Sequence, residues 1–259
     1  MKIIVPGIDE RHLEESVRRL KSARLPLALT GAGISVASGI PDFRSPGGLW
    51  SRFNPDEYAT LEVFLRNPKK AWRLYRAVGE VLQDKKPNAA HYALARLEQQ
   101  GLLQGVITQN IDMLHQQAGS INVLEIHGEH RHLQCLRCGG LEKAMAEHYQ
   151  APEPPVCGGC GSILKPNVVL FGEGVRRLDE IHQLLQGCDL LLVVGTSARV
   201  HPAAGLPAII KRKNGLIYEF NLEETALTRG QSMRQSGSDF FFRGEAADTL
   251  QLLSRAAEL

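Results

Sequence analysis

Short, continuous apolar runs recur along this chain, and helical patterns separate them. The runs cover residues 26–29, 105–108, 123–126, 168–171, 190–194 and 216–220. Strands that are buried on both faces show such continuous runs. Amphipathic patterns predict helices over residues 9–23, 55–83, 88–100, 175–186, 203–212 and from 245 to the end, with a break near Asn67-Pro68 in the second. This alternation predicts an α/β fold with a parallel sheet that is covered on both faces.

Glycine or polar residues follow the last five of these runs. The segments that follow them are Gln109-Asn110-Ile111-Asp112, His127-Gly128-Glu129, Gly172-Glu173, Gly195-Thr196-Ser197 and Asn221-Leu222-Glu223. Open α/β sheets bind their ligands beyond the carboxyl ends of the strands. The sequence therefore predicts a binding site along this edge of the sheet.

The first run leads into a glycine-rich turn, Thr30-Gly31-Ala32-Gly33-Ile34-Ser35. Glycines at the carboxyl end of a strand allow backbone N–H groups to approach phosphate oxygens closely. The turn departs from the dinucleotide-binding fingerprint because Val36 stands where the third glycine belongs. Taken alone, it fits either a nucleotide-binding turn or an ordinary tight turn that begins a helix.

Four of the five cysteines form two C-x-x-C pairs with eighteen residues between them. These cysteines are Cys135, Cys138, Cys157 and Cys160, and glycines surround both pairs. Two such pairs predict a tetrahedral zinc site of the ribbon type. Because thiolates fill all four positions, we expect one structural ion without an open position for water. Cys188 stands apart from the two pairs, and we expect it to be a small buried residue.

Two other interpretations of the cysteine region carry less weight. A catalytic metal could use some of His127, His130 and His132, but four thiolates already complete a coordination shell. Zinc ribbons also occur in nucleic-acid-binding proteins, but no evident basic and aromatic surface accompanies this one. We therefore expect no direct nucleic-acid binding.

Composition is typical of an ordinary globular protein. The chain has 259 residues, 43% of them apolar and 22% charged, so it fits one large domain or a large domain with a small insert. The formal net charge of +2 gives no case for bulk binding to nucleic acid or membrane. No segment approaches the roughly 20 apolar residues that cross a bilayer, and the N-terminus does not resemble a signal peptide. We therefore expect a cytoplasmic protein that does not bind membranes.

The order of motifs along the chain resembles the sirtuin family of NAD-dependent protein-lysine deacylases. The motifs are G-A-G-I-S, G-I-P-D-F-R, T-Q-N-I-D, H-G, the paired C-x-x-C, K-P-x-V-V-x-F-G-E, G-T-S and N-L-E, within about residues 25–246. The resemblance implies a Rossmann-like, NAD-binding domain that is formed by residues 1–45, 87–127 and 166–259. It also implies a small domain that combines a helical insert at 46–86 with a zinc ribbon at 128–165. NAD and acyl-lysine would enter the cleft between the domains from opposite sides.

The resemblance further implies which residues bind NAD. The glycine turn would contact phosphate, the loop at 42–44 would close over the nicotinamide ribose, and the segment 109–112 would shape the nicotinamide pocket. Segments after the last two runs would contact phosphate and the adenosine ribose. The implied NAD-binding residues are Gly31, Ala32, Gly33, Ser35, Asp42, Phe43, Arg44, Gln109, Asn110, Ile111, Asp112, Gly195, Thr196, Ser197, Asn221, Leu222, Glu223 and Ala246.

His127 is the general base that the resemblance implies, and Asn110 and Asp112 are the other implied catalytic residues. In the family's reaction the acyl oxygen attacks C1′ of the ribose as nicotinamide leaves, and the histidine then activates a ribose hydroxyl. The products are free lysine and O-acyl-ADP-ribose. An imidazole suits this role because its ordinary pKa of about 6.5 leaves much of it unprotonated at neutral pH.

The implied partners are acyl-lysine proteins or peptides. Val168, Phe171, Gly172 and Glu173 match the segment to which the substrate peptide adds as a strand in the family. Strand addition gives affinity through backbone hydrogen bonds and therefore depends little on the sequence of the substrate.

The acyl preference is expected to be neutral. In the desuccinylase branch of the sirtuins a Tyr-x-x-Arg pair meets the distal carboxylate of an acidic acyl group. Here Tyr75 is present, but Val78 stands where that arginine would be. An acidic acyl chain would lose its charge-assisted partner, so we expect acetyl or longer neutral acyl groups.

Two other functions use the same features. A mono-ADP-ribosyltransferase would use the same NAD site with another acceptor nucleophile, and these residues do not separate it from a deacylase. A non-catalytic zinc-ribbon binding module is less consistent with the presence of His127, Asn110 and Asp112.

Overall fold

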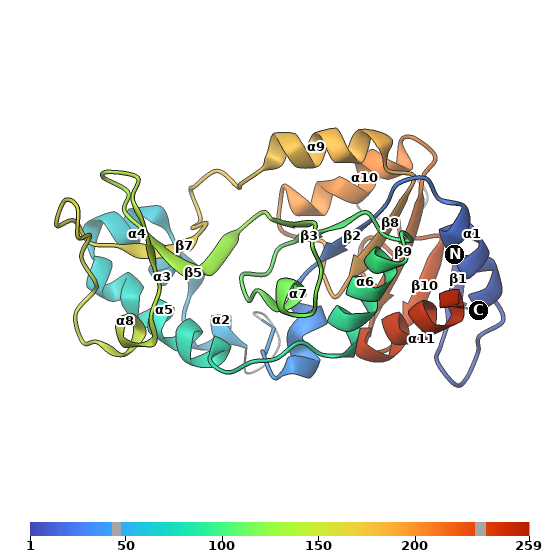
Figure 1. Ribbon diagram of the computed structural model, residues 1–259, viewed down its shortest axis with the longest axis horizontal. Coiled ribbons are helices and arrows are strands. Elements are labelled where there is room, and N and C mark those ends of the chain that lie inside the picture. Colours follow the sequence, from blue (N-terminus) through green and yellow to red (C-terminus); the bar gives the residue numbers. More distant parts are fainter. Residues whose placement is uncertain (43–47, 231–236, 259) are drawn as a thin grey trace.

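The chain forms two lobes, a larger one built around a parallel sheet and a smaller one built around an antiparallel sheet (Figure 1). The computed structural model describes residues 1–42, 48–230 and 237–258. Within these residues the larger sheet has seven strands in the order β1-β10-β9-β8-β2-β3-β4, with parallel neighbours throughout. The strands are β1 (Lys2–Ile4), β2 (Pro26–Thr30), β3 (Gly105–Thr108), β4 (Val123–Glu125), β8 (Leu190–Val194), β9 (Leu216–Asn221) and β10 (Phe240–Arg243). The predicted α/β fold with a Rossmann-like parallel sheet is confirmed.

Helices cover both faces of this sheet (Figure 1). The first face carries α1 (Leu13–Ser22), α6 (Ala89–Gln99) and α11 (Ala246–Glu258), and the second carries α9 (Leu178–Gly187) and α10 (Leu206–Lys211). Side chains of β8 alternate between the two cores, so that Leu192 packs on the first face and Leu191 and Val193 on the second. Because β8 is buried on both sides, its sequence is apolar throughout.

The strand order reverses between β2 and β8. From β2 the chain proceeds through β3 to β4 on one side, and from β8 it proceeds through β9 to β10 on the other. Open α/β sheets bind ligands at such a reversal, in the crevice beyond the carboxyl ends of the strands. The 3₁₀ helix η1 (Ala32–Ser38) begins at this position, directly after β2. Two further short helices of this lobe are α7 (Leu114–Gln117) and η2 (Ala203–Gly205).

The smaller lobe combines two segments that are distant in sequence (Figure 1). Its sheet contains β5 (Gly128–Gln134), β6 (Leu141–Lys143) and β7 (Lys165–Val168), and its helices are α2 (Leu49–Arg52), α3 (Pro55–Tyr58), α4 (Leu61–Arg66), α5 (Pro68–Leu82) and α8 (Ala146–Gln150). Trp72 of α5 is completely buried, and its Nε1 donates a hydrogen bond to the carbonyl oxygen of Leu164 at 2.9 Å. Cys135 and Cys157 pack into the same cluster. The helices and the cysteine-bearing segment therefore share one hydrophobic core.

The predicted break in the long helical region is confirmed. α4 ends at Arg66, and the side chain of Asn67 then caps α5 by accepting a hydrogen bond from the Lys70 N–H at 3.1 Å. Pro68 follows as the first residue of α5, where its missing N–H costs no helical hydrogen bond. A second break separates α3 from α4 at residues 59–60, and the sequence did not predict it.

The apolar run 168–171 is not a strand of the parallel sheet, contrary to the sequence prediction. Only Val168 of this run belongs to β7, and β7 pairs antiparallel with β5 in the smaller sheet. The chain then leaves the sheet and pairs with the break between α3 and α4. Phe171 N–H donates to Ala59 O at 3.0 Å, and Leu61 N–H donates to Phe171 O at 2.9 Å. The connection between α3 and α4 therefore bonds the N–H and C=O of Phe171, which a neighbouring strand would bond if this run lay in a sheet.

Candidate active site

Five strand ends of the parallel sheet lie side by side and carry glycine or polar residues. In the spatial order β9, β8, β2, β3 and β4, the residues at or after these ends are Asn221, Gly195, Gly31, Gln109 and His127. Thr30 of β2 is in register with Thr108 of β3 and Val194 of β8, so these three strands end at the same level. The structure therefore assembles the predicted edge, except that Gly172 and Glu173 follow β7 of the smaller sheet.

Two glycine turns touch at the reversal of the strand order. The N–H of Gly33 donates to Gly195 O at 2.8 Å. A Cβ on Gly33 would lie 2.6 Å from Gly195 Cα, and a Cβ on Gly31 would lie 2.9 Å from Gly195 O. Gly195 itself has φ +55°, and a Cβ there would lie 2.4 Å from Ile34 N. The two turns can approach this closely only as glycines, and bare backbone of this kind at strand ends suits a phosphate-bearing ligand such as NAD.

A hydrogen-bonded chain runs across the strand ends through Gln109. Its Nε2 donates to Thr196 Oγ1 at 3.1 Å and to Thr30 O at 3.3 Å. Its carbonyl oxygen accepts from His127 Nδ1 at 2.9 Å, and Asn221 Nδ2 donates to Thr196 O at 3.2 Å. This chain links the ends of β4, β3, β8 and β9 and fixes the polar groups of the edge relative to one another.

His127 has a defined tautomer and a lowered pKa. Because a carbonyl oxygen can only accept, Nδ1 carries the proton in the bond to Gln109 O and Nε2 of the neutral ring is left as the acceptor. Burial lowers the pKa of His127, although the bond to Gln109 acts in the opposite direction. Protonation is thus disfavoured, and the neutral ring, which can accept a proton at Nε2, predominates at neutral pH.

A buried polar cluster lies beneath the glycine turn. Ser35 Oγ donates to Asp112 Oδ2 at 2.6 Å, and Asn110 Nδ2 donates to Ser35 Oγ and to Gly31 O, each at 3.2 Å. Asp112 Oδ1 accepts from the N–H of Leu114 at 3.0 Å. These contacts hold the amide of Asn110 and the carboxylate of Asp112 in fixed orientations beside η1.

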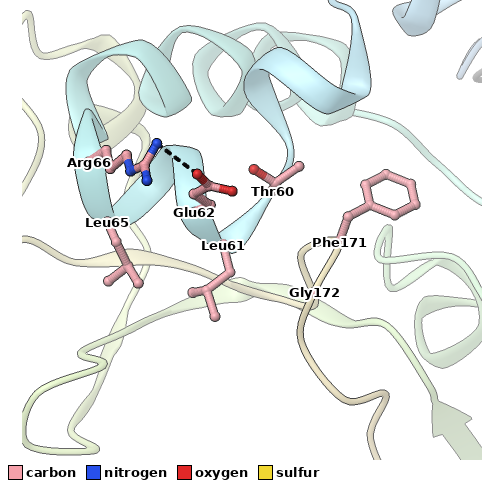
Figure 2. Close-up of a pocket in the computed structure, with 7 residues that line it drawn as sticks. All are labelled: Thr60, Leu61, Glu62, Leu65, Arg66, Phe171 and Gly172. Atoms are coloured by element: carbon pink, nitrogen blue, oxygen red, sulfur yellow. Dashed lines mark ion pairs between the residues drawn. The ribbon is translucent and has the colours of Figure 1, made fainter.

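The predicted substrate segment lies against α4 and helps to line a cavity of about 560 Å³. Figure 2 shows Leu61 and Leu65 on one side of this cavity, Phe171 and Gly172 on the other, and the exposed Glu62–Arg66 ion pair beside them. Phe171 is 51% exposed. The N–H of Val169 donates to His127 O at 2.8 Å. The segment is therefore bonded to the backbone of His127 at one end and to the α3–α4 connection at the other.

The four paired cysteines meet in the smaller lobe. Their sulfur atoms all lie within 4.8 Å of one another, with 3.5 Å between Cys135 and Cys160 and 3.6 Å between Cys138 and Cys157. A tetrahedral zinc ion with Zn–S bonds of about 2.3 Å separates its ligands by about 3.8 Å. The four sulfurs fit such an ion, and with four thiolates its coordination is complete.

Comparisons with known proteins agree on one family. The sequence model of the Sir2 family matches residues 31–202. The chain belongs to the Sir2 family. Over 243 residues it is 44% identical to an NAD-dependent protein deacylase of Pyrococcus abyssi. This alignment covers 91% of this chain and 94% of the relative.

Solved structures of Sir2 proteins share the fold. A Sir2 homologue in complex with NAD superposes with a TM-score of 0.86 at 39% identity, over 95% of this chain and 93% of the other. A Sir2 protein with deacetylated p53 peptide and 3′-O-acetyl-ADP-ribose has a TM-score of 0.84 at 34% identity, over 94% and 97%. The sirtuin resemblance expected from the motif order is confirmed.

The remaining residues that the Sir2 resemblance implied for NAD lie near the same edge or beyond the described chain. Ala32 is the first residue of η1, and Ala246 is the first residue of α11, which packs against η1. The carbonyl oxygen of Ile111 accepts a hydrogen bond from His130 Nδ1 at 2.6 Å. Asp42 is partly buried, whereas Ser197, Leu222 and Glu223 are exposed. Phe43 and Arg44 lie outside the described residues.

Sequence reasoning missed several buried polar residues of this Sir2 chain. His91 is completely buried with Nε2 3.5 Å from Ser35 Oγ, and burial lowers its pKa to about 4 against the charge of Asp112. The sequence feature that could have pointed to His91 is Asn88, which lies three residues earlier and caps α6. The Nδ2 of Asn88 donates a hydrogen bond to Ile34 O at 2.8 Å. The cap therefore ties α6 to η1.

Glu219 and Lys165 are two further buried groups that were missed. The Glu219 carboxylate accepts hydrogen bonds from the hydroxyls of Thr225, Thr228 and Ser238 and so holds the chain that follows β9. Lys165 is completely buried beneath the segment 168–173. Glu219 is a lone charged residue inside the apolar run 216–220, which could have pointed to it, whereas Lys165 lies outside the apolar runs.

Loss of zinc should loosen the smaller lobe. We expect Cys138→Ser to lower the zinc content below one ion per chain, because the ion would keep only three thiolates. Both tryptophans, Trp50 and Trp72, lie in this lobe, so their fluorescence should shift to longer wavelength as the shared core opens. Cys188→Ala should retain the zinc. Full zinc content and unchanged emission in Cys138→Ser would contradict the assignment.

Proposed function

We propose that this chain is an NAD-dependent protein-lysine deacylase that cleaves NAD to nicotinamide and transfers the acyl group to ADP-ribose. The observation that carries the proposal is the setting of His127. Its Nδ1 donates to Gln109 O, as part of the series of hydrogen bonds that crosses the strand ends. No described residue bonds its Nε2. A neutral imidazole with a free Nε2 beside a glycine-lined crevice suits a general base that acts on a bound dinucleotide.

NAD would lie along the crevice between the ends of β2 and β8. The turns at Gly31–Gly33 and Gly195–Ser197 would meet its pyrophosphate, since their glycines present bare backbone. Asn221 and Glu223 at the end of β9 would face the adenosine ribose, and Asn110 and Asp112 the nicotinamide ribose. The residues assigned to NAD in this proposal are those named for it above, including Phe43 and Arg44. Bound NAD supplies the reactive ribose carbon and the hydroxyl that finally carries the acyl group.

His127 would accept the proton of a ribose hydroxyl at Nε2. The hydrogen bond from Nδ1 to Gln109 O keeps the ring in the tautomer that can do so. The same bond stabilises the imidazolium that forms when Nε2 takes the proton. Asn110 and Asp112 would hold the ribose in place through the polar cluster with Ser35, because their own orientations are fixed by hydrogen bonds.

The acyl-lysine peptide would bind beside Val168, Phe171, Gly172 and Glu173. Strand addition at this segment is restricted, because the N–H and C=O of Phe171 already bond Ala59 and Leu61. Among the described residues, nothing bonds the backbone N–H or C=O of Gly172, which is exposed. Gly172 is therefore the position whose backbone a peptide strand would bond.

No helix within the described residues is long and apolar enough to cross a membrane. The cytoplasmic location and the lack of nucleic-acid binding remain predictions of the sequence. The division into a domain of 1–45, 87–127 and 166–259 and a domain of 46–86 and 128–165 also remains a proposal. The shared core of the smaller lobe supports it, although β7 crosses its boundary at 165–166.

Product analysis by mass spectrometry tests the proposed reaction. With NAD and an acetyl-lysine peptide, the wild-type protein should yield nicotinamide, deacetylated peptide and O-acetyl-ADP-ribose. His127→Ala should lower the rate by about 10²- to 10⁴-fold, the usual contribution of a general base, while the zinc content stays unchanged. A protein-borne ADP-ribose adduct without deacetylated peptide would instead identify a mono-ADP-ribosyltransferase. Full activity in His127→Ala would exclude the assigned role.

The rate should also depend on pH through His127. Burial lowers the pKa of this ring, so it stays neutral down to pH values below its ordinary value of about 6.5. As the pH falls through the lowered pKa, Nε2 becomes protonated and can no longer accept a proton. We expect the acid limb of kcat/KM to have its midpoint below pH 6.5. A midpoint above that value in a folded protein would contradict this account.

The acyl preference can be tested with matched peptides. Val78 is partly buried on the same helix as the buried Tyr75, where it offers no charge to an acidic acyl group. Acetyl-lysine should therefore be removed faster than succinyl-lysine from the same peptide sequence. Val78→Arg should raise the ratio of succinyl to acetyl turnover. Faster removal of succinyl by the unchanged protein would refute the prediction.

A further inference from the structure

Lys165 begins β7, and its side chain is completely buried. Its Nζ donates to Val168 O at 2.5 Å and lies 3.1 Å from Glu173 Oε2. A third contact, to Pro166 O, is 3.4 Å long. A buried ammonium is costly unless it is paired and hydrogen-bonded, and every contact of this one lies within the segment 166–173. The ammonium therefore acts as an internal anchor of that segment.

Glu173 turns its carboxylate inward to meet this anchor. Its Oε2 accepts a hydrogen bond from the N–H of Leu170 at 2.8 Å as well as pairing with Lys165. The hydroxyl of Tyr75 is buried without a partner among the described residues, and burial together with the charge of Glu173 raises its pKa. The Glu173 carboxylate thus bonds within its own segment, to the N–H of Leu170 and to Lys165.

The anchored segment presents its outer face to the candidate peptide site. Phe171 and Gly172 are exposed at its tip, where they help to line the cavity of Figure 2. The segment also bonds the active site directly, through Val169 N–H to His127 O at 2.8 Å. The Lys165–Glu173 pair therefore controls the position of the tip relative to His127.

We propose that Lys165 and Glu173 are positioning residues for the acyl-lysine peptide, because their internal ion pair holds the segment 168–173 in its peptide-binding shape. This inference rests on the proposed deacylase function. Neither side chain contacts NAD in the proposal, so the effect should be confined to the peptide. An ion pair that contacts no substrate can in this way determine how well a substrate binds.

Steady-state kinetics with both substrates tests the inference. Lys165→Met and Glu173→Gln should each raise KM for the peptide about tenfold, while KM for NAD stays within about twofold of wild type. The double variant Lys165→Met/Glu173→Gln leaves no unpaired buried charge and should be no worse than the worse single variant, since the two residues act as one unit. If a single variant fails to fold, the double variant still allows the measurement.

An exposed ion pair of the same lobe supplies the matched control. The Nζ of Lys69 lies 2.8 Å from Glu153 Oε2, and both side chains are 67% exposed. Lys69→Met/Glu153→Gln removes the same charges and should leave both KM values unchanged, because exposed pairs contribute little. Equal changes in the two KM values, or an unchanged peptide KM in the folded double variant, would overturn the inference.

Hydrogen exchange separates this inference from the proposed function. In the protein without substrate, the N–H of Leu170 is protected by Glu173, and the double variant Lys165→Met/Glu173→Ala, which also removes this acceptor, should exchange it at least about tenfold faster. If the wild-type protein does not deacylate peptides, the proposed function fails while the exchange result still tests the anchor. If deacylation occurs but exchange at Leu170 is unchanged in the double variant, the anchor is refuted.

Discussion

The contact between Gly33 and Gly195 is the constraint on which the active edge depends. Both backbones occupy space that a Cβ would need, and the hydrogen bond from Gly33 N–H to Gly195 O holds them together. This close approach places Thr196 within reach of Gln109, and Gln109 in turn orients His127. The polar chain across four strand ends is possible only because two turns meet without side chains between them. The two glycines that the turn shares with the dinucleotide fingerprint, Gly31 and Gly33, are thus required by this contact.

Much of the fold of both lobes follows from local sequence. The run 190–194 is apolar at every position because β8 is buried on both faces, and this pattern predicted the strand with its exact bounds. The two C-x-x-C pairs predicted the zinc site because their spacing and glycines leave few alternatives. The break at Asn67 was readable because an Asn cap and a following Pro act within one turn. Local chemistry was sufficient in each case.

The features that local sequence could not reveal depend on distant partners. The run 168–171 looks like a buried strand, but Phe171 finds its backbone partners at Ala59 and Leu61, more than a hundred residues earlier in the chain. β1 and β10 were not predicted, since each is short and is defined by pairing across the sheet. α1 begins at Leu13 and not at the expected Asp9, whose carboxylate bonds Arg11 instead of capping the helix. The structural roles of Lys165 and Glu219 depend on the groups that contact them in the folded chain, which local sequence does not show.

The single core of the smaller lobe imposes an order on its folding. Trp72 and Leu164 are 92 residues apart in the chain, so synthesis at roughly 5–20 residues per second separates their appearance by about 5–20 s. During that interval α5 can pack only against α3 and α4 of its own lobe, because the cysteine-bearing segment that completes the core is still missing. The helices therefore cannot complete their packing before Cys157 and Cys160 emerge. Zinc binding and the complete burial of Trp72 therefore both wait for residues 157–164, and until then part of the apolar face of α5 stays exposed on the nascent chain.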